Sequence, residues 1–261
     1  MVLVRQADHA AVSAHLATQW RRPTAFTNEL WQGLIDATQH HDDGWIDEDA
    51  RPEIDPNGVP RHFLNMPLQT HLEIWRRSIG MALDRSPLVG LLVARQARWL
   101  YTPREPSKGD QDRANKQRSE YEQRLLQDFL HETDREVTRI ESDLSAQHTS
   151  ELLDLARGLL SFLDALSLMM LGAIPMRHWP EILTMGDSTN EVSVRTAVSS
   201  EHGQDYRTIS VDPWPFAPDR VRSQVSASYV GAASFESAEE LREELANAPA
   251  HRIFWELSSP P

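Results

Sequence analysis

An acidic residue, Asp164, lies in the middle of the most apolar segment of the chain, LLSFLDALSLMML at residues 159–171. On a helix, Asp164 shares a stripe with Leu160 and Leu168, one turn away on either side. A carboxylate on such a stripe loses its hydration, which is costly unless a cation or several hydrogen-bond donors replace the water. Asp164 therefore indicates either a buried ion site or a polar contact at the edge of the helix with a serine, an arginine or solvent.

The segments before Pro175 are mostly helical by their apolar spacing. The pair Ser86 and Pro87 is a typical helix start, because serine caps and proline suits the first turn. Residues 44–65 contain several prolines and glycines and predict a loop. The predicted helices span residues 6–20, 28–41, 67–84, 87–101, 117–144 and 150–172.

After Pro175 the pattern changes to alternating, β-branched segments typical of short strands. Residues 237–248 interrupt them with a short helix that begins at a serine cap. We therefore predict a mainly α fold. Its helical core spans residues 1–175, with a polar linker at 102–116, and a small α+β extension with antiparallel strands spans 176–261.

The sequence HHDDGW at residues 40–45 ends the second predicted helix with an imidazole and a carboxylate side by side. His41 and Asp42 suit a borderline or hard divalent cation. A helix C-terminus explains a histidine through the helix dipole, but it does not explain two acids there. His9 lies on the apolar stripe of the first helix. A lone histidine in that position is more often a core residue hydrogen bonded to a carbonyl. His9 therefore supports a metal site only together with other candidate ligands beside it.

The chain contains no cysteine, so a metal site must use nitrogen and oxygen ligands. A divalent ion such as Mn, Fe, Zn, Ni or Mg fits such ligands. Phosphate-binding glycine loops, dinucleotide fingerprints and the GxSxG elbow are absent from the sequence. Nucleophilic catalysis consequently has little support, and metal chemistry is favoured.

The formal net charge of −13 disfavours duplex nucleic acid and anionic membranes as partners. A small anionic metabolite remains compatible, because a bound cation reverses the sign of the potential inside a cleft. The longest apolar run is interrupted by polar residues, and the N-terminus lacks the apolar stretch of a signal peptide. We expect a cytoplasmic protein, with a homodimer as one option for its assembly.

Three further residues are candidates for catalysis. Asp43 follows the His-Asp pair, and His71 lies on the apolar side of the third predicted helix, so either could act as a general base. His71 could also be a metal ligand. Arg95 could hold phosphate or carboxylate near a metal, although a surface position is the alternative.

The order of a histidine, a His-Asp pair and a distant aspartate on successive helices resembles the HD superfamily. The resemblance implies an HD-like helical core in which His9, His41, Asp42 and Asp164 bind one metal. Histidines on intervening helices can bind a second metal in that superfamily, and His71 matches such a position.

A closer resemblance covers nearly the whole chain. The segments QADH, HHDDGW, NMPLQTHLEIWRRSI, GLLVARQARWLY, DALSLMML and DPWPF are similar to a bacterial family catalogued as domain of unknown function 3891. The resemblance carries no activity with it. In that family the position of Gln96 is usually a histidine, so a second metal or a proton-shuttling histidine is in doubt here.

The first functional hypothesis is a metal-dependent hydrolase, namely a phosphohydrolase acting on a small phosphorylated metabolite or nucleotide. The second is an oxygenase with two irons, which needs more ligands than these four residues provide. The third is a non-catalytic interaction module that a metal stabilises.

Overall fold

The structure is a computed structural model that describes residues 1–102, 118–144, 146–176, 178–184, 189–197 and 206–260. The predicted linker at 102–116 falls almost wholly outside the described residues. The described helices are α1 (Gln6–Gln19), α2 (Asn28–His40), the 3-10 helix η1 (Asp43–Trp45), α3 (Ile46–Ala50), α4 (Leu68–Arg85), α5 (Pro87–Tyr101), α7 (Glu120–Leu144), α8 (Ser150–Leu171) and α9 (Ala238–Asn247). The described strands are β1 (Val2–Leu3), β2 (His178–Leu183), β3 (Thr189–Ala197), β4 (Tyr206–Asp212), β5 (Arg220–Tyr229) and β6 (Ala250–Ser258).

Side-chain caps explain where several helices begin. Thr27, Ser86, Thr149 and Ser237 each accept a hydrogen bond from the backbone N–H three residues later. Pro87 occupies the first turn of α5, as the sequence predicted. Gly172 ends α8 in the left-handed region, with φ of 76°. Among the described helices, none is long and apolar enough to cross a membrane.

The strands form one sheet, in which the described strands have the order β1-β5-β6-β4-β3-β2. All neighbours are antiparallel except β4 and β6, which are parallel. A parallel pair needs a long crossover, and here the chain runs through β5 and α9 before β6 returns between β5 and β4. The sheet is therefore mixed.

The prediction of a mainly α fold was wrong, because the structure is mixed α/β. The prediction of an antiparallel extension also missed the parallel pair. The alternation of side chains indicates that a strand exists, but it does not determine which strand becomes its neighbour. The N-terminal β1 joins the same sheet beside β5, so the sheet combines both ends of the described chain.

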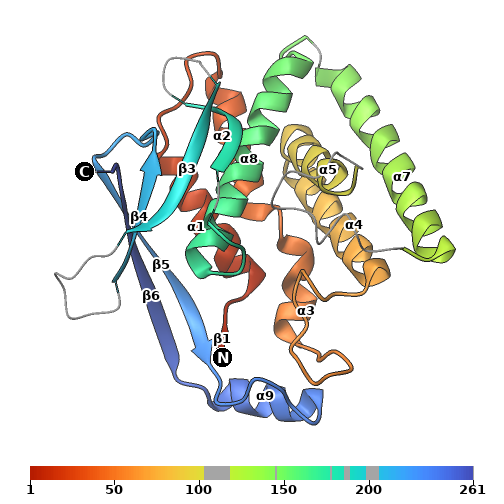
Figure 1. The fold of residues 1–261 in the computed structure, drawn as a ribbon. Coiled ribbons are helices and arrows are strands. Elements are labelled where there is room, and N and C mark those ends of the chain that lie inside the picture. Colours follow the sequence, from red (N-terminus) through yellow and green to blue (C-terminus); the bar gives the residue numbers. More distant parts are fainter. Residues whose placement is uncertain (103–117, 145, 177, 185–188, 198–205, 261) are drawn as a thin grey trace.

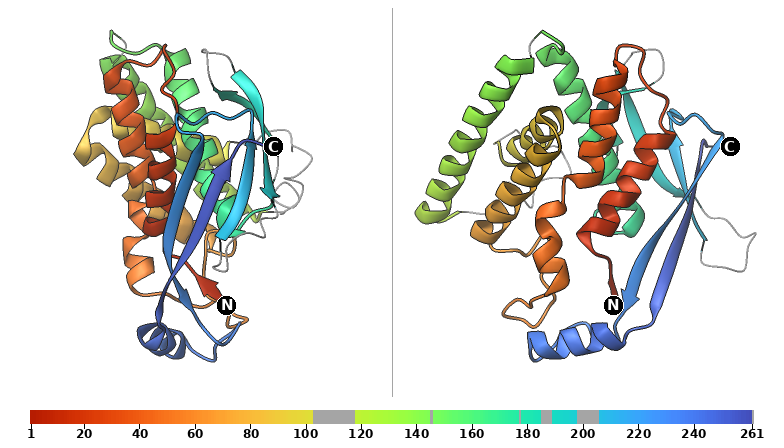
Figure 2. Two further views of the ribbon diagram at one scale, coloured as in Figure 1. Left: turned by 90° about the vertical axis from the view of Figure 1, so that its left-hand side faces the viewer. Right: turned by 180° about the vertical axis from the view of Figure 1, so that it is seen from behind.

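The described helices from α1 to α8 lie on one side of the sheet, whereas α9 lies at one end of β5 and β6 (Figures 1 and 2). Helices α1 and α8 are in contact with the sheet. One continuous cluster of buried side chains joins helices and strands, including Leu16, Leu163 and Trp255. Trp255 of β6 also donates from Nε1 to the carbonyl of Met170 in α8 at 2.9 Å. The helical segment before residue 175 and the strands after it thus share a core.

Helix α5 is the most enclosed helix of this core. It packs against α4 and α7 as well as α2 and α8. Buried residues run from Leu88 to Ala97 without interruption, and they include the polar pair Arg95 and Gln96. These two polar residues mark two buried polar clusters, one of which contains Asp164.

Candidate metal centre

Four side chains from three separate parts of the chain meet inside the helical layer. His9 comes from α1, His41 and Asp42 follow α2, and Asp164 comes from the middle of α8. His9 Nε2 lies 3.1 Å from Asp164 Oδ1 and 3.5 Å from Asp42 Oδ2. His41 Nε2 lies 3.6 Å and 3.5 Å from the same two oxygens. The structure thus brings together the four residues predicted as ligands.

The His41 ring is fixed with one nitrogen facing the cluster. Its Nδ1 donates to the carbonyl of Thr38 at 2.8 Å, and the side chain is 1% exposed. Its Nε2 is buried without a hydrogen-bond partner, since contacts of 3.5 Å or more to carboxylates are too long. In the neutral ring Nε2 therefore carries a lone pair directed into the cluster. A buried acceptor of this kind needs a cation or a proton.

The His9 ring is oriented in the same way by serines. Its Nδ1 is hydrogen bonded to Ser167 Oγ, which itself donates to the carbonyl of Asp164 at 3.0 Å. A hydroxyl has only one proton, so His9 Nδ1 is the donor to Ser167, and Nε2 is left as the acceptor. Ser13 Oγ, 3.0 Å from Ser167 Oγ, completes this buried group. Both imidazoles consequently present Nε2 to the two carboxylates.

The two carboxylate oxygens of Asp164 have different partners. Oδ1 faces both imidazoles, whereas Oδ2 accepts from Gln96 Nε2 at 3.4 Å. Gln96 in turn accepts at Oε1 from Ser161 Oγ. Because the hydroxyl must donate to the carbonyl oxygen of the amide, the NH₂ group of Gln96 is turned toward Asp164.

Gly44 holds the His-Asp segment against α4. A Cβ at this position would lie 2.1 Å from the carbonyl oxygen of Ile74, so only glycine allows this approach. The Gly44 N–H donates to Ser78 Oγ at 3.0 Å, and its carbonyl accepts from Arg77. The glycine of HHDDGW therefore has a packing role that fixes the position of Asp42.

The electrostatics of the cluster follow from its burial and its mixed charges. Burial alone would lower the pKa of His41, but Asp42 and Asp164 outweigh it and raise the pKa to about 10. Burial opposes ionisation of Asp164 as well, yet the two histidines hold its pKa well below the usual range. Burial raises the pKa of Asp42 above its ordinary value, against the opposing effect of His41 and His9. Without an ion, these shifts favour a protonated His41 beside an ionised Asp164.

The separations of these atoms also suit ligands of one ion. Two ligand atoms about 2.1 Å from a shared ion lie roughly 3.0 Å apart at a right angle and roughly 3.4 Å apart at a tetrahedral angle. The distances between imidazole nitrogens and carboxylate oxygens range from 3.1 to 3.6 Å. His9, His41 and Asp42 offer ligand atoms that all lie within 4.8 Å of one another. These three residues therefore fit a divalent metal with nitrogen and oxygen ligands, and Asp164 Oδ1 lies beside both imidazole nitrogens as a candidate fourth ligand.

Asp43 and His40 form a pair that the sequence analysis did not identify. His40 Nδ1 lies 2.8 Å from Asp43 Oδ2, and His40 Nε2 lies 3.6 Å from Asp36 on the preceding turn of α2. The available signal was the spacing of three and four residues, which places such side chains on one face of a helix. A histidine thus holds Asp43 beside Asp42, one of the candidate ligands.

His71 and Arg95 form contacts with other residues of the helical layer. His71 Nδ1 is hydrogen bonded to Tyr101 Oη at 2.7 Å, and its ring packs against Trp45. Arg95 donates to Glu141 at 2.7 Å and to Asp154 at 2.9 Å, between α7 and α8. Arg95 is committed to ion pairs within the helical layer, away from Asp164.

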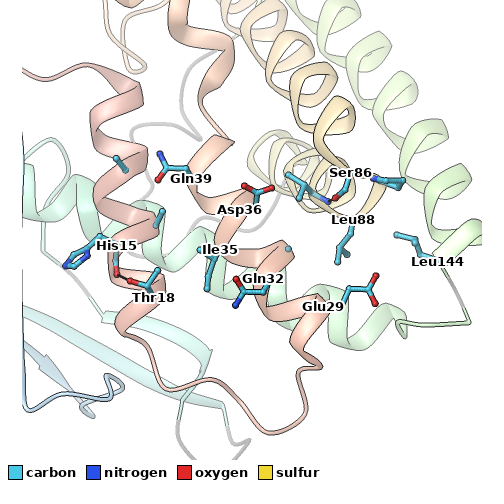
Figure 3. Close-up of a pocket in the computed structure, with 15 residues that line it drawn as sticks. His15, Thr18, Glu29, Gln32, Ile35, Asp36, Gln39, Ser86, Leu88 and Leu144 are labelled. Carbon is cyan, nitrogen blue, oxygen red and sulfur yellow. Dashed lines mark hydrogen bonds between the residues drawn. The ribbon is translucent and has the colours of Figure 1, made fainter.

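A groove of about 730 Å³ lies on the outer side of α1 and α2 (Figure 3). Its lining includes His15 and Thr18 from α1, Asp36 and Gln39 from α2, and Ser86 at the start of α5. None of the four clustered residues lines it. The groove and the cluster are therefore separate features of the same helices.

Comparison with known proteins places the chain in a family. The sequence profile of the family described as "Protein of unknown function (DUF3891)" matches residues 1–232, which include the four clustered residues and the strands through β5. No curated protein and no solved structure matches the chain. The chain belongs to the DUF3891 family.

Proposed function

We propose that this protein binds a divalent metal ion through His9, His41, Asp42 and Asp164 and acts as a metal-dependent hydrolase. The substrate class that we propose is a small phosphorylated metabolite or nucleotide. The proposal rests on the arrangement of donor atoms, since membership of the family carries no activity with it.

The observation that carries the proposal is the unpartnered Nε2 of His41. Structural histidines in a core are normally hydrogen bonded at their polar atoms, and here only Nδ1 is satisfied. The free lone pair faces two carboxylates and a second imidazole nitrogen. Hydrogen bonds from the Nδ1 atoms to the carbonyl of Thr38 and to Ser167 Oγ fix both rings, as is usual for metal-ligating histidines.

A packed polar cluster without metal is the competing account. In that case a shared proton would link the imidazoles to Asp42 and Asp164. The contacts of His41 Nε2 to both carboxylates, at 3.5 and 3.6 Å, are longer than a hydrogen bond to a protonated ring should be. An ion between the atoms accounts for these separations better than a proton does.

A divalent ion bound here would supply Lewis acidity and would lower the pKa of water. The residues of the chain hold and orient the ligand atoms. The candidate groups for proton transfer are Asp43, which is hydrogen bonded to His40, and His71, which is hydrogen bonded to Tyr101. We do not retain the proposed phosphate contact for Arg95, because its guanidinium is already paired with Glu141 and Asp154.

The experiment is phosphate release by metal-free protein reloaded with Zn²⁺, Ni²⁺, Fe²⁺, Mn²⁺ or Mg²⁺. The substrates are p-nitrophenyl phosphate and a panel of nucleoside mono-, di- and triphosphates. We expect release that depends on metal and that is lost in Asp164→Asn. Asp154→Asn is the matched control on the same helix, since Asp154 is 65% exposed and lies in the Arg95 cluster.

The outcomes separate the parts of the proposal. Metal binding without phosphate release from any substrate would contradict the hydrolase and leave the metal site standing. Metal-independent release that Asp164→Asn does not change would contradict a role of this cluster in catalysis.

A further inference from the structure

The contacts of Gln96 point to a role in setting how Asp164 binds an ion, and thereby which ion the site accepts. Gln96 is 1% exposed and lies on α5, opposite the polar side of α8. Its NH₂ group donates to Asp164 Oδ2, and its carbonyl oxygen accepts from Ser161. Among the described residues, Gln96 is hydrogen bonded to Asp164 at Oδ2, the oxygen that does not face the imidazoles.

The orientation of the Gln96 amide is determined by its partners. Ser161 Oγ is a hydrogen-bond donor to Oε1, and Arg157 Nη1 donates to the same serine at 3.4 Å. With the lone pairs of Ser161 facing Arg157, the serine proton is directed to Gln96. Nε2 then has to face α8, where Asp164 Oδ2 is the acceptor.

This contact leaves Asp164 with one oxygen for an ion. Oδ1 lies within 3.6 Å of both imidazole nitrogens, whereas Oδ2 is directed at the amide. A carboxylate held in this way binds through a single oxygen. Ca²⁺ takes six to eight oxygens and often a bidentate carboxylate, whereas Zn²⁺ is satisfied by about four nitrogen and oxygen ligands.

We propose that Gln96 is a positioning residue that keeps Asp164 monodentate and so selects a small transition-metal ion over Ca²⁺. The inference rests on the proposed metal site. Two imidazoles already favour Zn²⁺, Ni²⁺, Co²⁺ or Fe²⁺, and Gln96 adds a geometric restriction to this chemical preference.

The test compares wild-type protein with Gln96→Met, which keeps the volume of the side chain but removes the amide donor. Binding of Zn²⁺, Co²⁺ and Ca²⁺ is measured by titration of metal-free protein, and the visible spectrum of the Co²⁺ form reports its coordination number. We expect Zn²⁺ and Co²⁺ affinity to fall by about 10- to 100-fold, as for other residues that orient a ligand. Ca²⁺ affinity should stay the same or rise, and the Co²⁺ bands should weaken as coordination increases.

Thr133→Val is the matched control. Thr133 is buried and donates to the carbonyl of Phe129 within α7, so this variant loses a buried hydroxyl on a helix that carries none of the four clustered residues. Its Co²⁺ spectrum and its Zn²⁺ to Ca²⁺ preference should match those of the wild type. Ser161→Ala gives a second approach if Gln96→Met does not fold, because it frees the amide to turn and should shift the same preference in the same direction.

The outcomes distinguish this inference from the proposed function. Wild-type protein that binds none of the three ions would overturn both. Wild-type protein that binds Zn²⁺ while Gln96→Met and Ser161→Ala keep the same affinities and the same Co²⁺ spectrum would overturn the role of Gln96 alone. A shift that Thr133→Val reproduces would also overturn it, because the effect would then be structural.

Discussion

Helix α5 places two adjacent residues, Arg95 and Gln96, in two different buried polar clusters. Arg95 is satisfied within the protein, since its guanidinium donates to Glu141, Asp154 and Ser150. The cluster beside Gln96 is incomplete, because His41 Nε2 has no hydrogen-bond partner among the described residues and lies 3.5 and 3.6 Å from two carboxylate oxygens. Burial of charge is therefore a poor criterion for function. The two clusters differ in whether each buried donor and acceptor finds a hydrogen-bond partner within its cluster.

The largest expected effect is that of Asp164→Asn on the metal-loaded protein. An ion present at a thousandfold excess over its Kd stabilises the native state by about 4 kcal/mol, and loss of an anionic ligand removes most of this. In chelated protein the same change should destabilise the native state less, because it removes only the contacts with the two histidines that hold the pKa of Asp164 below its usual range. Thermal melts with and without metal measure both effects. Equal shifts in both preparations would show that Asp164 is structural and would remove the contrast between the clusters.

Gly44→Ala should be the next most damaging change. The added Cβ would lie 2.1 Å from the backbone oxygen of Ile74 and 2.7 Å from Ser78 Oγ. Displacing a packed helix backbone costs about 3 kcal/mol, at the upper end of overpacking effects. Because Gly44 follows Asp42 and Asp43, metal affinity should fall together with stability in urea unfolding and metal titration. Lower stability with unchanged affinity would show that the ligand segment is positioned by other contacts.

Arg95→Met should destabilise the protein by about 2 kcal/mol, less than for a fully buried ion pair because Asp154 is largely exposed. The decrease should be equal in metal-loaded and chelated protein, in contrast to Asp164→Asn. Urea unfolding in both states is the measurement. A metal-dependent difference would mean that the two clusters are coupled through α5.

Asp49→Asn tests the smallest effect and has a defined pH dependence. Asp49 accepts from the N–H of Ala7 at the start of α1, and burial, with Asp42 adding to it, raises its pKa to about 6. The folded protein therefore binds this proton more tightly than the unfolded chain. The associated stability is present below pH 3.8 and is lost as the pH rises through about 6.

At pH 8, Asp49→Asn should stabilise chelated protein by about 1 kcal/mol, a value reduced for the partial exposure of the group. At pH 4 the gain should be close to zero. Metal should reduce the gain, because a cation offsets the charge of Asp42. Melts across this pH range provide the check, and a gain that is constant with pH would rule out ionisation of Asp49 as its cause.

The helices of the fold could be predicted from the sequence, whereas the sheet could be predicted only in part. Helical periodicity and caps such as Ser86 are local signals, and α1, α2, α4, α5 and α8 lie close to their predicted bounds. The short α3 was missed inside a loop with many breakers. The parallel pairing of β4 with β6 depends on contacts between distant residues, which alternation along one strand does not encode.

The candidate site, too, could be predicted only in part. The sequence indicated His9, His41, Asp42 and Asp164, because a charge on an apolar stripe is unusual in the sequence itself. It did not indicate the supporting contacts of Ser167, Gln96 and His40, because serine, glutamine and histidine are common on a partly polar helix. Which of α5's two neighbouring polar residues faces Asp164 depends on the rotation of the helix, and only the tertiary packing determines it.

The most direct test of the account is the metal content of the protein purified without chelators, measured by elemental analysis beside His41→Ala. His41→Ala removes Nε2, a buried nitrogen that has no hydrogen-bond partner among the described residues and that faces both carboxylates of the cluster. The account predicts about one divalent ion per chain in the wild type, as expected for a single site of four ligands, and a large loss in the variant. A wild-type protein that contains no ion and takes up none when Zn²⁺, Mn²⁺, Fe²⁺ or Ni²⁺ is added would contradict the account.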